Sequence, residues 1–128
     1  MTNTNIYVKI ISEVIDMDHK MKLNNKPFSL IKLGTKTIEL RLNDEKRRKI
    51  VVGDRIEFTN RDTNEKIMTE VIKLHNYPNF KELYKHFDKI SLGYSEDDEA
   101  NPSDMNEYYS EEEQNKYGVL GIEIKLIK

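Results

Sequence analysis

The sequence predicts a single α+β domain, a small and partly open mixed β-barrel with short flanking helices. Three observations predict this fold class. A length of 128 residues fits one domain. Short β-branched runs recur between turn signals, which is typical of strands. The segments between those runs are too short for the crossover helices of a doubly wound parallel sheet.

The chain divides into an N-terminal extension, residues 1–18, and the domain proper, residues 19–128. Within the extension, residues 6–15 (IYVKIISEVI) are apolar and β-branched, and they fit either a strand or a short helix. We favour the helix. Residues 21–23 predict the first short strand of the domain.

A helix is predicted over residues 26–33, because both of its ends carry stop signals. Asn25 is the expected N-cap, Pro27 lies in the first turn, and Gly34 follows the last turn. Residues 37–42 then alternate polar and apolar side chains, which predicts a half-buried strand.

The middle of the chain predicts a β-hairpin. The charged cluster 44–49 is too polar for the core and indicates a loop or one helical turn. Gly53 and Asp54 mark a turn into a strand over 55–58, residues 60–64 provide the hairpin turn, and residues 66–74 form the partner strand.

The C-terminal third predicts two helices and a final strand. Apolar residues recur at helical spacing over 79–88, which predicts a helix, whereas residues 93–107 carry turn formers and acids and indicate a loop. Ser110, followed by three glutamates, predicts the N-cap of another helix. Residues 119–127 form the last strand.

Composition limits the classes of function. No cysteine is present, so neither disulfides nor metal-binding thiolates occur, which suits a reducing cytoplasm. No signal peptide or membrane-spanning stretch is evident. We expect a cytoplasmic protein without a membrane partner, most simply a monomer.

Charge is distributed unevenly along the chain. The net charge is −2, which argues against avid, unspecific binding of nucleic acid. Residues 20–89 nevertheless carry 17 Lys and Arg against 10 Asp and Glu, a net charge of +7. Residues 90–117 carry nine acids against Lys116, a net charge of −8. A basic body with an acidic segment can still present a local surface that binds anions; solvated faces that partly neutralise each other are the alternative.

The most informative segment is Gly34-Thr35-Lys36-Thr37-Ile38-Glu39-Leu40-Arg41, where a helix ends and a charged strand begins. In a strand Thr37, Glu39 and Arg41 share one face, and Lys36 in the preceding turn can swing toward it. An arginine that binds anions, a lysine of tunable pKa and a carboxylate can together line the mouth of a pocket. An exposed strand face on which these charges neutralise one another is the alternative.

The string G-x-K-x-x-E-x-R, formed by Gly34, Lys36, Glu39 and Arg41, resembles the signature of ASCH domains (activating signal cointegrator homology), members of the PUA-like superfamily. The preceding helix, the Val-Gly-Asp turn at 52–54 and the closing segment 117–122 support the resemblance, which extends over roughly residues 20–127. It implies a β-barrel related to RNA-binding PUA domains, with the signature beside a cleft.

The resemblance implies RNA or a nucleoside or nucleotide, modified or not, as the ligand. Arg41 offers bidentate contacts to a phosphate or base edge, and Glu39 can accept from an exocyclic amine. The residues expected to bind the ligand are Gly34, Thr35, Lys36, Thr37, Glu39, Arg41, Asn60 and Arg61. Candidates for base stacking are Tyr77, Phe80, Tyr94 and Tyr109. Cations that could extend the basic surface are Lys46, Arg47, Arg48, Lys49, Arg55 and Arg61.

The alternative function is hydrolysis. One branch of the superfamily is similar to a small amidohydrolase that removes the acetyl group of acetylcytidine with a lysine, a threonine and a glutamate. Lys36 matches that lysine, but Glu39 occupies the position of the threonine. If the chain is an enzyme, Lys36 and Glu39 are the catalytic candidates, with a distal glutamate among Glu96, Glu99 and Glu107. Ribonuclease activity is a related possibility.

Two further expectations follow from spacing. His19, His75 and His86 lack the spacing of metal ligands, so we assign them structural or solvent-exposed roles and expect no metal or cofactor. A third function, docking of a basic protein partner on the acidic stretch 96–113, also remains open.

Overall fold

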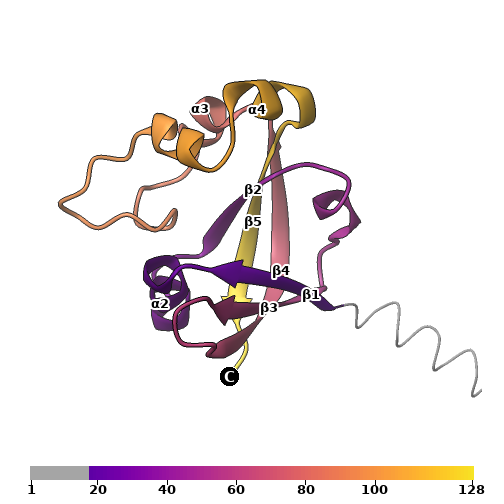
Figure 1. Ribbon diagram of the computed structural model, residues 1–128, viewed down its shortest axis with the longest axis vertical. Helices are drawn as coiled ribbons and strands as arrows, with labels where there is room; N and C mark the ends of the chain where they lie inside the picture. The colour runs from indigo at the N-terminus through magenta and orange to yellow at the C-terminus, as the bar shows by residue number, and fades with distance from the viewer. Residues whose placement is uncertain (1–17) are drawn as a thin grey trace, which may run out of the picture.

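The computed structural model describes residues 18–128 and shows a five-stranded, strongly curved sheet in the order β1-β3-β4-β5-β2 (Figure 1). β1 runs parallel to β3, and the other neighbouring strands are antiparallel. The sheet is therefore mixed and forms a half-barrel, and with the short helices around it the predicted α+β class is confirmed. The strands are β1 (Asp18–Leu23), β2 (Ile38–Leu42), β3 (Arg55–Asn60), β4 (Lys66–Tyr77) and β5 (Val119–Leu126).

The helix α2 (Asn25–Leu33) ends at Gly34, which has the left-handed φ of 94° expected of a C-cap glycine. The predicted N-cap is wrong by one residue, because Asn24 occupies that position and Asn25 is helical. The side-chain oxygen of Asn25 instead accepts a hydrogen bond from Asn60 Nδ2 at 2.9 Å. A long-range contact thus uses the group that would have capped the helix.

The hairpin of β3 and β4 lies where it was predicted, with its turn at residues 60–64 and Asn64 at φ 62°. Both strands run longer than expected, to Asn60 and to Tyr77. A bulge between Val71 and Lys73 lets β4 bend and pair with β5 along its full length. The charged cluster 44–49 contains one short turn, η1 (Arg47–Lys49).

The helix predicted over 79–88 is mostly absent, since α3 spans only Phe80–Leu83. The residues that follow are used in tertiary contacts: Phe87 packs edge-on against His75, and His86 stacks on Tyr77. These contacts draw the chain toward β4 and end the helix early.

The segment 93–107, expected to be a loop, contains the 3₁₀ helix η2 (Pro102–Glu107). Its start is stabilised by the side chain of Asn101, which accepts from the Ser103 amide at 3.0 Å, and its Met105 is buried. The helix α4 (Glu111–Tyr117) begins with the predicted cap at Ser110, which forms a full capping box with Glu113.

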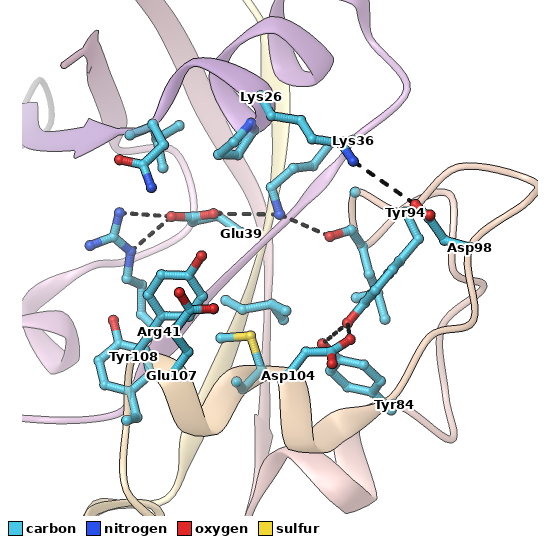
Figure 2. A pocket seen from close by; sticks show the side chains of 18 of the residues that line it. Lys26, Lys36, Glu39, Arg41, Tyr84, Tyr94, Asp98, Asp104, Glu107 and Tyr108 are labelled. Atoms are coloured by element: carbon cyan, nitrogen blue, oxygen red, sulfur yellow. Dashed lines mark hydrogen bonds and ion pairs between the residues drawn. The ribbon is translucent and has the colours of Figure 1, made fainter. Parts of the chain in front are cut away.

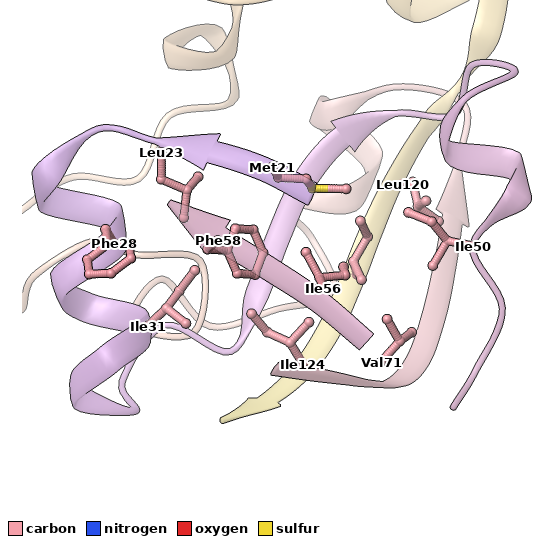
Figure 3. Close-up of a cluster of buried hydrophobic side chains, with 11 residues drawn as sticks. Met21, Leu23, Phe28, Ile31, Ile50, Ile56, Phe58, Val71, Leu120 and Ile124 are labelled. Carbon is pink, nitrogen blue, oxygen red and sulfur yellow. The ribbon is translucent and has the colours of Figure 1, made fainter. Parts of the chain in front are cut away.

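Two groups of buried side chains hold the fold together. The larger fills the half-barrel and joins β1, α2 and the β3–β4–β5 sheet, with Phe28, Ile56 and Phe58 nearly inaccessible to solvent (Figure 3). The smaller lies beneath the segment that connects β4 to β5 and joins Ile38 and Leu42 of β2 to Phe80, Leu83 and Leu92. The second cluster therefore fixes the 84–109 segment beside β2. No helix among residues 18–128 is long and apolar enough to cross a bilayer.

Candidate functional site

Lys36 follows the Gly34 turn, and its ammonium group is buried where β2 begins. Its Nζ donates to the carbonyl oxygens of Ile38 at 2.7 Å and Leu92 at 3.1 Å, and lies 3.5 Å from Oε1 of Glu39. Three acceptors thus surround a group that has three N–H donors. Because Leu92 belongs to the connection between β4 and β5, Lys36 joins that connection to the sheet.

Gly93 makes room for this lysine. Its φ is +104°, and a Cβ atom at this position would lie 3.0 Å from Cδ of Lys36. The glycine therefore has both a conformational and a steric reason to occupy this position.

Glu39 and Arg41 follow Lys36 along β2, and we call these three charged side chains the ionic row (Figure 2). Oε2 of Glu39 accepts a hydrogen bond from Nε of Arg41 at 2.8 Å and forms an ion pair with Nη2 at 2.8 Å. Nη2 donates to the carbonyl oxygen of Lys22 at 3.3 Å. Glu39 is only 4% exposed, so its charge is balanced by the two flanking cations and not by water. The strand was expected to be half-buried, but its side chains are covered on both faces.

The pKa values within the row reflect burial and mutual attraction. Burial alone would raise the pKa of Glu39, but the positive charges and hydrogen bonds of Arg41 and Lys36 outweigh it, so the pKa lies below its ordinary value. For Lys36, burial and the Arg41 charge together outweigh the attraction of Glu39 and lower the pKa. For Arg41, burial is the largest single influence and would lower the pKa. The negative charge of Glu39, the interaction with Tyr109 and the hydrogen bonds to both residues together overcome it and raise the pKa.

The ionic row forms one side of a cavity of about 610 Å³, within the size range of small-molecule sites. Helix α2 and the end of β1 border the cavity on one side, and the segment 92–109 borders it on the other (Figure 2). Four tyrosines line it: Tyr84, Tyr94, Tyr108 and Tyr109. The Tyr94 hydroxyl lies 2.8 Å from that of Tyr84 and donates to Asp104 at 2.8 Å, which holds this part of the wall together.

Half of the residues expected to bind a ligand lie at the cavity. Lys36, Glu39, Arg41 and Arg61 line it. Gly34 and Thr35 form the turn after α2, and Thr37 immediately precedes β2, but none of the three is among the lining residues. Asn60 is buried beneath the hairpin turn, where its side chain also accepts from the Asp62 amide at 2.9 Å.

The aromatic and basic candidates divide in the same way. Tyr94 and Tyr109 line the cavity, whereas Phe80 is in the core and Tyr77 stacks on His86. Of the six cations proposed to extend the basic surface, only Arg61 reaches the cavity. Arg47 and Arg55 pair with Asp44 and Asp18.

Other lining residues were not singled out from the sequence. Lys22 and Lys26 lie at the end of β1 and the start of α2, and Asp98 and Asp104 lie on the far side. Glu99 and Glu107, which were singled out as candidates for a catalytic glutamate, line the same side as these two acids. The residue spacing within β2 gives no signal for Lys22, Lys26, Asp98 and Asp104, because they are distant in sequence and come close to the ionic row only in the folded chain. The amphipathic pattern at Phe80, Leu83 and Tyr84 was the only available hint that this segment returns to the sheet.

The histidines have partners within the fold. His19 Nε2 lies 2.8 Å from Asp54, and His75 Nε2 lies 2.9 Å from Glu123. Among residues 18–128, no group of three His, Cys, Asp or Glu side chains is arranged to hold a metal ion.

Comparison with known proteins found no match among curated proteins. Several solved structures are similar in fold. The crystal structure of the hypothetical protein PH0355 shares 34% sequence identity with a TM-score of 0.70, covering 87% of this chain and all of that one. The solution structure of protein PF0455 from Pyrococcus furiosus shares 34% identity with a TM-score of 0.65, covering 88% of this chain and 99% of that one.

The crystal structure of an ASCH domain from Lactobacillus crispatus JV V101 is 15% identical, with a TM-score of 0.58 over 92% of this chain and 84% of that one. At that identity the likeness concerns the fold. The family model of the ASCH domain itself matches residues 21–128, nearly the whole length that the sequence signature implied, and the chain therefore belongs to the ASCH domain family.

Proposed function

We propose that the cavity beside β2 binds the base of RNA or of a free nucleoside or nucleotide. The observation that carries the proposal is the unused acceptor capacity of Glu39. Its Oε2 is engaged by Arg41, through a hydrogen bond from Nε and an ion pair with Nη2, but Oε1 has only Lys36 at 3.5 Å. A carboxylate has about four acceptor positions, so a donor on a ligand can reach this oxygen from the cavity.

A nucleobase fits the surroundings of that oxygen. Its edge carries N–H donors next to ring acceptors, which complements a carboxylate beside the Arg41 guanidinium. Its flat face suits the tyrosine wall, where Tyr108 is 59% exposed and free to stack. ASCH domains resemble RNA-binding PUA domains, which agrees with this choice of ligand.

The test uses Tyr108, whose replacement leaves the ionic row intact. Calorimetric titration of the full chain with the four ribonucleosides and a short single-stranded RNA should identify a ligand. Tyr108→Ala should then weaken its binding roughly tenfold through lost stacking. Tyr108→Phe, which keeps the ring, should bind like wild type. Equal affinities of wild type and Tyr108→Ala, or no binding by any probe, would overturn the proposal.

Hydrolysis is the second candidate function, and the same purified protein can be used to test it. Glu99 and Glu107 line the cavity and Glu96 does not, but Lys36 is occupied by two carbonyl groups, and no hydroxyl replaces the missing threonine at Glu39. These contacts favour binding over turnover. Incubation with acetylcytidine and with labelled RNA checks the point, and conversion of either substrate that is lost in Glu39→Gln would favour the enzyme.

A further inference from the structure

The charges at the cavity are balanced in number but separated in space. Five cations and five carboxylates line it. Three of these groups form the ionic row, which leaves three cations and four acids. The cations come from β1, α2 and the hairpin turn, and the acids from residues 98–107 alone. We call Lys22, Lys26 and Arg61 the basic rim.

The basic rim has unused donors. All three side chains are exposed, and among residues 18–128 no acid forms an ion pair with Lys22 or Arg61. Arg61 donates from Nη1 to the side chain of Asn24 at 3.2 Å, which holds the guanidinium near α2 and leaves its other N–H groups available. The neighbouring Asn25 amide is already taken by Asp62 at 3.3 Å, so the anion-binding capacity resides in the side-chain cations.

Among residues 18–128, one ion pair joins the basic rim to the acids of residues 98–107. Lys26 Nζ lies 4.0 Å from Asp98, and the lysine is largely exposed (Figure 2). An exposed pair at this distance is weak and easily displaced. An incoming anion with higher charge can therefore take Lys26 from Asp98.

From this geometry we infer that the basic rim is a subsite for one phosphate group, so that the cavity takes a nucleoside monophosphate unit in preference to a nucleoside. The inference rests on the proposed function and names its ligand more narrowly. The base lies against Glu39 and the tyrosines, and its phosphate receives charge-assisted hydrogen bonds from Lys22, Lys26 and the Arg61 fork. The acids on the opposite side repel a phosphate there, which gives the ligand one orientation.

The experiment compares ligands that differ only in the phosphate. The full chain is titrated at 0.15 M salt, roughly physiological, where long-range attraction is largely screened. The probes are each nucleoside that binds and its 5′- and 3′-monophosphates, because the sugar has two possible phosphate positions. In the wild type, one monophosphate should bind about tenfold more tightly than the nucleoside, as expected for a few charge-assisted bonds.

A double variant tests whether the basic rim is responsible. Lys22→Gln with Lys26→Gln should reduce the advantage of the monophosphate to nearly onefold and leave the affinity for the nucleoside unchanged. The matched control, Lys46→Gln with Lys49→Gln, removes the same charge from exposed residues that do not line the cavity and should keep the full advantage. Asp98→Asn should tighten binding of the monophosphate, because Lys26 loses its competing partner.

The possible failures are distinct. If nucleosides bind but the phosphate adds nothing, the inference is overturned and the proposed function stands. An advantage that persists in the Lys22/Lys26 variant, or that disappears equally in the control, would also overturn the assignment of the basic rim. If nucleosides, monophosphates and the short single-stranded RNA all fail to bind, the proposed function fails with it.

Discussion

Within the G-x-K-x-x-E-x-R signature, the three charged side chains differ in how many of their hydrogen-bonding groups are used by contacts within the fold. Lys36 directs all its donors at internal acceptors, and Arg41 holds Glu39 through a hydrogen bond from Nε and an ion pair with Nη2. Only Glu39 keeps an acceptor oxygen with spare capacity. Removing Lys36 would therefore disturb the fold before it tests binding, whereas replacements at Glu39 report on both.

Glu39→Gln should reduce stability at pH 7 by about 3 kcal/mol, because it leaves two cations near a buried neutral group. The pKa of Glu39 in the folded protein lies below its ordinary value of 4.5, so its contribution is complete above that pH and is lost as the pH falls through the folded-state pKa. The difference between wild type and variant should therefore narrow below pH 4.5. Urea unfolding at several pH values measures this difference.

Glu57→Gln is the matched control for that experiment. Glu57 lies 3.6 Å from the exposed Lys66, so its replacement should change stability by under about 1 kcal/mol. A constant difference between wild type and Glu39→Gln across the acid range would contradict the pKa assigned to Glu39.

A comparison of two glycines separates backbone strain from steric contact. Gly34 and Gly93 both have left-handed φ values, +94° and +104°, but a Cβ at Gly34 meets nothing within 4 Å, whereas one at Gly93 meets Lys36. Gly34→Ala should lower stability by about 1 kcal/mol from the φ alone. Gly93→Ala should lower it by about 2–3 kcal/mol, since crowding of a buried side chain is added. Equal losses in chemical denaturation would show that Lys36 moves aside freely.

At the level of elements, the sequence predicted correctly those helix ends that are determined by hydrogen bonds between residues close in sequence. Gly34 ends α2, and Ser110 begins α4 with its capping box, because those bonds are made within a few residues. The predicted N-cap of α2 and the predicted length of α3 were wrong because distant residues engage the side chains involved. Asn60 donates to the side chain of Asn25, and His75 and Tyr77 pack against Phe87 and His86. The ionic row that forms one side of the cavity could therefore be predicted from the sequence around one strand. The acidic side formed by residues 98–107 could not be predicted, because its position depends on long-range contacts such as that between Lys36 and Leu92.

The capping box of α4 provides a test at this scale. Ser110→Ala removes the acceptor for the Glu113 amide at 3.1 Å and should lower stability by about 1 kcal/mol. Ser29→Ala, an exposed serine inside α2 whose hydroxyl makes one long contact of 3.4 Å, should change it by no more than about 0.5 kcal/mol. Thermal unfolding of both variants checks the difference, and an unchanged midpoint for Ser110→Ala would contradict a stabilising cap.

In the whole molecule, the half-barrel and the 84–109 segment are built differently. The half-barrel has paired strands and a continuous core, whereas the segment has short helices and turns joined to β2 through the second cluster. Opening of the segment alone should therefore need less free energy than global unfolding.

Amide hydrogen exchange followed by mass spectrometry should show this contrast. Peptides from β3, β4 and β5 should exchange slowest, and those from 94–109 faster. Addition of a monophosphate that binds should slow exchange in 94–109 and leave the η1 turn, which does not line the cavity, largely unaffected. Slower exchange across all peptides alike would indicate a general gain in stability and would contradict a ligand held against this segment.

The two outermost strands, β1 and β2, come together without pairing their backbones: the link between them is the guanidinium of Arg41 at the carbonyl oxygen of Lys22. In a closed barrel, backbone hydrogen bonds of regular spacing would join these two strands. Here the separation of the two strands depends on an arginine side chain and not on a ladder of backbone hydrogen bonds. The seam between β1 and β2 is thus the part of the half-barrel whose width can change while every strand keeps its paired neighbour.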